Sequence, residues 1–116
     1  MDIVITIPKK IKWEDYQKEL DVVKDGSQMM LYHIPLKPKE NIVGKRCYLC
    51  YDGYVRGWMR IIDVRCSLQF LCSTHDTLWP EGWYVCRSGE FHKITPVPMK
   101  GFRGYRYIQE GTFEDK

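Results

Sequence analysis

The sequence predicts a small α+β domain, mainly β, in which about six or seven short strands and one main N-terminal helix form a closed or partly open β-barrel. Three observations predict it. Short apolar runs recur between turn residues, one stretch from Trp13 has helical spacing, and Asp52-Gly53 marks a tight hairpin. The length of 116 residues suits one domain. We therefore assign 1–109 to a single domain and 110–116 to a polar C-terminal tail.

The N-terminal third predicts a strand, a helix and a second strand. Residues 3–7 are mostly apolar and stop at Pro8, which indicates a short strand. An amphipathic helix follows, and its apolar residues recur at intervals of three and four: Trp13, Tyr16, Leu20 and Val23. Gly26 stands where such a helix would end, and 29–34 indicates a strand before Pro35. We expect the aromatic residues of the helix to face the core.

The clearest local signal is a hairpin with strands at 47–51 and 54–64. Asp52-Gly53 suits a type I′ turn because both residues tolerate positive φ angles. Pairing outward from the turn places Tyr48 opposite Gly57 and Cys47 opposite Trp58. One face is then interior, with Tyr48 over the space left by Gly57, and comprises Tyr48, Cys50, Val55, Gly57, Met59 and Ile61. The other face comprises Tyr51, Tyr54, Arg56, Trp58 and Arg60.

The second half of the chain predicts further strands. Segments 69–73 and 83–87 are strand-like, 87–90 indicates a turn, and 91–94 is expected to pair beyond it. Segment 100–108 is expected to be the closing strand. Alternation along it places Arg103, Tyr105 and Tyr107 on one face and Phe102, Gly104, Arg106 and Ile108 on the other. We expect Phe102 and Ile108 to close the barrel.

The charge and the cysteines restrict the possible functions. The net charge of +3 is mild, but residues 27–113 carry twelve Lys and Arg against seven Asp and Glu, which permits a local basic face. The chain shows no apolar run of membrane-spanning length and no signal-peptide pattern, so we expect a cytoplasmic protein without a membrane partner. We expect five reduced, mostly buried cysteines.

A structural zinc site is the alternative interpretation of these cysteines. Cys47 and Cys50, and likewise Cys72 and His75, have the spacing of half a zinc site. However, Cys47 and Cys50 belong to a predicted strand, where residues three apart point to opposite faces. We therefore predict no metal site and no cofactor.

Two segments combine cations with aromatic rings. Arginine flanks tryptophan at Arg56, Trp58 and Arg60, and the closing segment holds Lys100, Arg103, Tyr105, Arg106 and Tyr107. Cations bind phosphates and planar rings stack on bases, so both segments suit nucleic acid. Trp79 and Trp83 flank a turn and are expected to line the rim of a pocket. The alternative is structural: the closing segment forms an ordinary strand and Trp58 covers a secondary core beneath the helix.

The order of the elements resembles the PUA-like superfamily, which includes PUA, ASCH and EVE domains. The resemblance rests on strand, helix, strand and proline-bounded loop followed by the hairpin from Gly44 to Gly53 and by Gly57 to Ile61. It implies a small β-barrel that binds RNA or recognises modified bases.

The ASCH signature G-x-K-x-x-E-x-R would fall on residues 26–33. Only Gly26 matches, because Gln28, Leu31 and His33 replace the lysine, glutamate and arginine. Some ASCH proteins are similar to amidohydrolases that use that lysine and glutamate, and Leu31 can supply no such chemistry.

We therefore predict a non-enzymatic domain that binds RNA, single-stranded nucleic acid or a modified base, with no catalytic residue. Two alternatives stay open. One is a protein-interaction or regulatory module of the phage or mobile-element type, which would use the same aromatics as hot spots. The other is a nucleoside-directed amidohydrolase.

Overall fold

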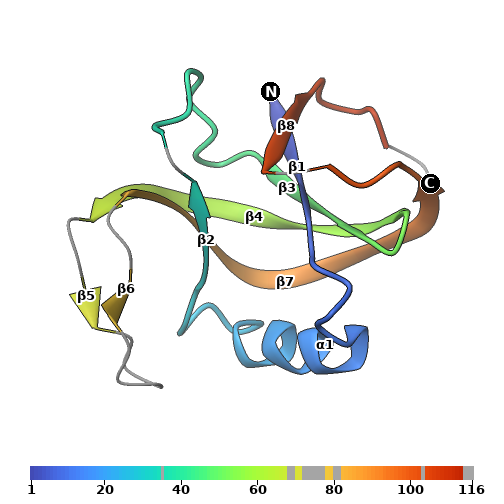
Figure 1. The fold of residues 1–116 in the computed structure, drawn as a ribbon, viewed down its shortest axis with the longest axis horizontal. Helices are drawn as coiled ribbons and strands as arrows, with labels where there is room; N and C mark the ends of the chain where they lie inside the picture. Colours follow the sequence, from blue (N-terminus) through green and yellow to red (C-terminus); the bar gives the residue numbers. More distant parts are fainter. Residues whose placement is uncertain (35, 68–69, 72–77, 80–81, 103, 114–116) are drawn as a thin grey trace.

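The structure is a computed structural model and describes residues 1–34, 36–67, 70–71, 78–79, 82–102 and 104–113. These residues form one helix and eight strands, which Figure 1 labels. Their bounds are β1 (Asp2–Thr6), α1 (Trp13–Val22), β2 (Met30–Ile34), β3 (Arg46–Tyr51), β4 (Tyr54–Ser67), β5 (Phe70–Leu71), β6 (Leu78–Trp79), β7 (Gly82–Pro98) and β8 (Tyr105–Ile108). The mainly-β fold with one helix agrees with the sequence.

Six strands form one sheet in the order β2-β7-β4-β3-β1-β8, and β5 and β6 form a separate two-stranded ribbon. The large sheet curls into a half-barrel whose free edges are β2 and β8 (Figure 1). β1 and β3 run parallel, whereas the other paired strands of this sheet are antiparallel. The Tyr32 hydroxyl on β2 donates a hydrogen bond of 3.0 Å to the carbonyl of Gly104, just before β8. A side chain thus links the segments of the two edge strands.

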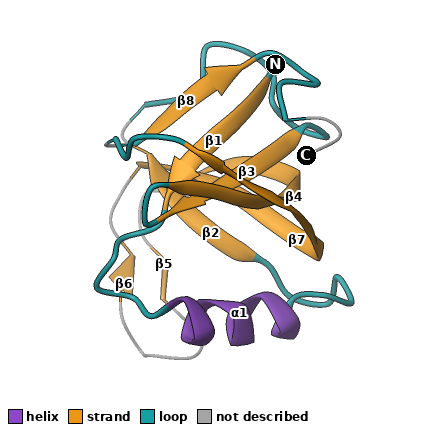
Figure 2. Ribbon diagram, turned by 90° about the vertical axis from the view of Figure 1, so that its right-hand side faces the viewer, coloured by secondary structure: helices purple, strands orange, loops and turns teal. Residues whose placement is uncertain are grey.

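The helix α1 packs at one end of the curled sheet (Figure 2). Glu14 and Asp15 lie in its first turn, where their negative charges interact favourably with the positive end of the helix dipole. Its inner side buries Tyr16 and Leu20, as the helical spacing predicts. Gly26 follows with a φ of 81°, which suits glycine at the end of a helix. The helix cannot cross a membrane, because it is too short and too polar.

The sheet carries a hydrophobic cluster on each face because side chains alternate along each strand. The inner cluster joins α1 to the concave side of the sheet and includes Ile3, Ile5, Cys47, Leu49 and Met59. The outer cluster lies on the opposite side and comprises Val4, Tyr48, Cys50, Val55, Trp58 and Phe113. Phe102 and Ile108 pack against this outer cluster. Cys47 and Cys50 therefore lie on opposite faces of β3, as predicted.

The hairpin between β3 and β4 confirms the predicted turn but corrects the predicted register. Asp52 and Gly53 have φ angles of 51° and 81°, which fit a type I′ turn. Tyr48 pairs with Trp58, not with Gly57, because Arg56 is an extra residue between Val55 and Gly57. This β-bulge moves Tyr48 and Trp58 to the same outer face.

Gly57 is needed where β4 meets β7. A Cβ atom there would lie 2.4 Å from the carbonyl oxygen of His92 and 2.5 Å from the ring of Phe91. Phe91, and not the predicted Tyr48, therefore packs beside this glycine.

The predicted turn at 87–90 is wrong. Residues 82–98 form the single strand β7, so the predicted strands 83–87 and 91–94 are one. The pairing of β4 with β7 shifts between Ser88 and His92, and Gly89 there has a φ of 91°. The Gly89 N–H donates a hydrogen bond of 3.0 Å to the carbonyl of Val23, beyond α1. An irregularity inside a strand thus replaces the turn.

Candidate nucleic-acid interface

Pairing across the sheet gathers the candidate site on its outer face. Arg46 on β3 lies opposite Arg60 on β4, and the next pair along these strands on the same face is Tyr48 with Trp58. Trp58 in turn lies opposite His92 on β7. Side chains directly opposite each other across paired strands lie about 5 Å apart, so their aromatic and cationic groups can touch.

Trp58 is the centre of a group that we call the tryptophan stack: Arg46, Trp58, Arg60 and His92. The His92 ring stacks on Trp58 with centroids 4.0 Å apart and planes inclined by 16°. The Cζ of Arg46 lies 4.1 Å from the Trp58 centroid. Two groups that close to one centroid must occupy opposite faces of the ring. Arg60 lies at 4.9 Å from the same centroid and adds a second cation–π contact.

The stack buries its tryptophan and leaves other members exposed. Trp58 is only 9% exposed, while Arg60 and His92 are exposed. Trp58 belongs to the outer cluster, so the secondary core that it covers is not beneath α1. It is therefore no open platform for a base, and the exposed ring of the stack is that of His92. Arg60 donates a hydrogen bond of 2.9 Å to the carbonyl of Gly44 and forms no ion pair within the described residues.

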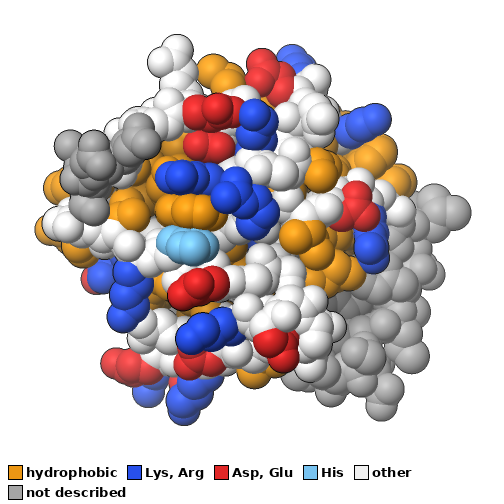
Figure 3. Space-filling model, turned by 180° about the vertical axis from the view of Figure 1, so that it is seen from behind, with side chains coloured by type: hydrophobic (Ala, Val, Ile, Leu, Met, Phe, Trp, Pro, Cys, Tyr) orange, Lys and Arg blue, Asp and Glu red, His pale blue; other side chains and the backbone are white. Residues whose placement is uncertain are grey.

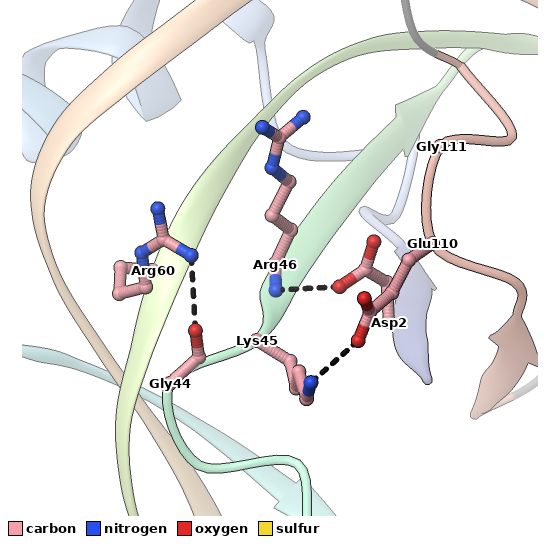
Figure 4. Close-up of a pocket in the computed structure, with 7 residues that line it drawn as sticks. All are labelled: Asp2, Gly44, Lys45, Arg46, Arg60, Glu110 and Gly111. Carbon is pink, nitrogen blue, oxygen red and sulfur yellow. Dashed lines mark hydrogen bonds and ion pairs between the residues drawn. The ribbon is translucent and has the colours of Figure 1, made fainter.

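A pocket of about 430 Å³ adjoins the stack and shares its two arginines. Its size falls within the range of small-ligand sites. We call it the charged pocket, and Figure 4 shows its lining: Asp2, Gly44, Lys45, Arg46, Arg60, Glu110 and Gly111. These residues come from the first residue of β1, the loop before β3, the first residue of β3, the middle of β4 and the segment after β8. One face of the molecule shows cations, hydrophobic side chains and a histidine side by side, with acidic side chains next to them (Figure 3).

The two carboxylates of the pocket have different partners. Asp2 is 3% exposed, and its Oδ1 accepts a hydrogen bond of 2.9 Å from the backbone N–H of Arg46. Glu110 is exposed and accepts a hydrogen bond from Nζ of Lys45. That hydrogen bond and the charge of Lys45 lower the pKa of Glu110, which is therefore ionised at neutral pH. Lys45 is thus balanced by a carboxylate, whereas Arg60 has no carboxylate partner among the described residues.

Three other predicted cations lie away from the stack. Arg56 is the bulged residue, and its Nε donates a hydrogen bond of 3.0 Å to the carbonyl of Tyr51, at the turn of the hairpin. Arg106 lies over the ring of Phe102, with Cζ 4.5 Å from the centroid. Lys100 is exposed and precedes Phe102 by two residues. Tyr48 lies between Trp58 and the β8 side of the outer face, and the ring of Phe113 packs against it. These two rings separate the tryptophan stack from the β8 side.

The predicted aromatics of the closing strand lie on the concave side. Tyr105 and Tyr107 are half-buried against the inner cluster, with ring centroids 5.5 Å apart. Trp83 packs against the same cluster, and Nζ of Lys37 lies 5.4 Å from its centroid. Arg103 and the side chain of Trp79 lie outside the described residues. The structure therefore brings Trp58 and Arg60 together but not with Tyr105, Tyr107 or Trp83.

Sequence reasoning missed Arg46, His92 and Asp2. Arg46 was detectable, because it precedes the hairpin at the position opposite Arg60 once the bulge is counted. The turn predicted at 87–90 places His92 on a separate short strand, so the sequence predicts no pairing of His92 with Trp58. Asp2 carries no local signal, because its place depends on the parallel pairing of β1 with β3.

No protein-family model matches this chain, and no curated protein or solved structure matches it either.

Proposed function

We propose that this chain binds single-stranded nucleic acid, RNA or DNA, through the tryptophan stack and the charged pocket. One observation carries the proposal. Two guanidinium groups lie on a single tryptophan ring, and one of them, that of Arg60, is exposed without a carboxylate partner in the described residues. A guanidinium held in this way presents several N–H donors in a fixed orientation, which suits phosphate oxygens.

The roles of the remaining stack residues follow from their exposure. His92 is exposed and offers the outer side of its ring to a base, while its other side rests on Trp58. Trp58 supports both neighbours and does not itself contact the ligand. Arg46 holds the second side of Trp58 and donates a hydrogen bond of 3.2 Å to the hydroxyl of Tyr48. The resemblance to PUA-like domains supports the same ligand class.

Fluorescence anisotropy with labelled mixed-sequence oligoribonucleotides and oligodeoxyribonucleotides tests the proposal. We expect Arg60→Gln to weaken binding and His92→Ala to weaken it further in the double variant. If about two cations contact phosphates, the affinity of the wild type should fall roughly sevenfold between about 50 and 200 mM salt. Removing one phosphate contact should reduce that salt dependence by about half.

The matched control is Arg65→Gln, which removes the same charge from the same strand. Arg65 lies five residues beyond Arg60 on β4 and pairs with Asp63 at 2.7 Å. If Arg65→Gln weakens binding as much as Arg60→Gln, the effect is that of net charge and the proposed site is wrong. Binding that is absent even at low salt refutes the proposed function. A partner protein that is still captured after nuclease treatment would then favour a protein-interaction module.

A further inference from the structure

The charged pocket holds its two carboxylates on one side, where Lys45 pairs with Glu110, and the guanidinium groups of Arg46 and Arg60 elsewhere in its lining. Figure 4 shows the Asp2 and Glu110 carboxylates together on one side, while the Arg46 side chain extends away from them and Arg60 points toward Gly44. A pocket for phosphate alone would need no carboxylate, since acidic groups repel that ligand. Its ligand should therefore carry hydrogen-bond donors as well as negative charge.

Asp2 has an acceptor oxygen left for such a donor. Its Oδ1 accepts the N–H of Arg46, and its Oδ2 accepts no hydrogen bond within the described part of the chain. The residue is 3% exposed and lines the pocket, so the solvent available to that oxygen is restricted. That oxygen keeps its capacity to accept a hydrogen bond, and a donor on a ligand in the pocket can supply one.

The glycines of the lining keep the pocket open. Gly44 has a φ of 84°, and a Cβ atom there would meet nothing within 4 Å. Gly111 likewise has a φ of 84°. Glycine tolerates this conformation and leaves the space beside the carboxylates and Arg60 free of side chains.

We infer that the charged pocket takes a nucleotide whose base carries an exocyclic amino group. The inference rests on the proposed function and adds a base preference to it. The amino group donates to Oδ2 of Asp2 and to the Glu110 carboxylate, while a phosphate of the same strand contacts Arg60. Carboxylates accept hydrogen bonds from the amino group of cytosine in this way. Uracil has a carbonyl oxygen at that position, and an oxygen facing a carboxylate is repelled.

Anisotropy titration with oligocytidylate and oligouridylate of equal length tests the inference. The two bases have the same ring size and differ in this donor, so their affinity ratio isolates it. We expect oligocytidylate to bind at least about tenfold more tightly, since the hydrogen bond is to a charged group. Oligoadenylate and oligoinosinate form a second pair with the same expected order.

Asp2→Asn is the decisive variant. The Asn Oδ1 can still accept the N–H of Arg46, while its amide nitrogen replaces only the oxygen that faces the pocket. We expect the ratio between oligocytidylate and oligouridylate to fall toward one, with thermal unfolding confirming that the variant folds. Glu110→Gln should lower the same ratio and provides a test even if Asp2→Asn does not fold. Asp15→Asn, on the exposed side of α1, is the control and should leave the ratio unchanged.

The outcomes separate this inference from the proposed function. Equal affinities, or a preference for oligouridylate, overturn the base preference but leave nucleic-acid binding intact. A preference for oligocytidylate that survives both Asp2→Asn and Glu110→Gln places the selectivity outside the pocket and also overturns the inference. If neither oligonucleotide binds at low salt, the inference and the proposed function fail together.

Discussion

His92 and Trp58 stack face to face across β7 and β4, with ring centroids 4.0 Å apart. His92 therefore covers one side of a ring whose other side is covered by Arg46. Because Trp58 is only 9% exposed, replacing it would disturb the outer cluster as well as the surface. His92 is exposed, so the stack is best tested by changing the histidine.

We predict that His92→Ala lowers the free energy of unfolding by about 1 kcal/mol, the usual contribution of a stacked aromatic pair. The variant should also make Trp58 more accessible, so that acrylamide quenches more of the tryptophan fluorescence. Urea unfolding and quenching measure these effects. His92→Phe is the control and should keep both values near those of the wild type. An unchanged stability in His92→Ala would mean that the contact contributes nothing to folding.

We predict that Gly57→Ala destabilises the protein by about 2 kcal/mol or more. The added methyl group would lie within 2.5 Å of the His92 carbonyl and the Phe91 ring, so β7 must move. Circular dichroism during thermal unfolding measures the loss. In a Phe91→Ala background, Gly57→Ala should cost less stability, because the clash with the ring is removed while the clash with the backbone remains. A neutral single substitution would contradict the close crossing of β4 and β7.

The sequence predicts those elements of the fold that depend on neighbouring residues. Asp52-Gly53 specifies a turn by its own conformational freedom, and the spacing from Trp13 specifies a helix. The bulge at Arg56 has no such local signal, and Gly57, which follows it, packs against Phe91 of another strand. Ser88-Gly89 has the composition of a turn, but Gly89 bonds to Val23, which only the tertiary fold brings near.

The residues of the candidate site likewise divide into those predictable from one strand and those that only the tertiary fold brings together. Trp58 and Arg60 were predicted because they alternate on one strand. Arg46 joins them only in the correct register, which differs from the predicted one by a single residue. Asp2 and Glu110 join them through β1 and the segment after β8, which are far from the hairpin in sequence. A pattern within one strand cannot show which strands lie beside it.

We predict a loss of stability at alkaline pH, to which Cys47 contributes. Burial raises the pKa of its thiol from 9.0 to about 11. The protonated thiol is therefore favoured by folding, and this stabilisation is complete below pH 9.0 and is lost as pH rises toward 11. Burial also raises the pKa of Tyr105 to about 12 and raises that of Tyr16, so both act in the same direction.

Urea unfolding across this pH range measures the effect. With about 1.4 kcal/mol per pKa unit, the shift at Cys47 corresponds to about 3 kcal/mol at most. Cys47→Ala will lower the stability at neutral pH, but its stability should decline less steeply above pH 9.0. Cys66→Ala is the control, since it makes the same substitution at an exposed cysteine outside the core. Equal pH dependence in Cys47→Ala and the wild type would exclude this role of Cys47.

The buried pair of Arg87 and Tyr16 is expected to be strongly coupled. Arg87 is 2% exposed, and its NH1 donates a hydrogen bond of 3.0 Å to the Tyr16 hydroxyl. Its Nε has no hydrogen-bond partner in the part of the chain that the structure describes. Arg87 forms no ion pair with a described carboxylate.

Tyr16→Phe therefore leaves a second donor of a buried cation unpaired and should cost about 1–3 kcal/mol. Arg87→Met/Tyr16→Phe removes both partners and should regain most of that loss, because an apolar side chain of similar length needs no desolvation of charge. Chemical denaturation of the two single variants and the double variant measures the coupling, and strictly additive effects would show that the hydrogen bond does not stabilise the fold.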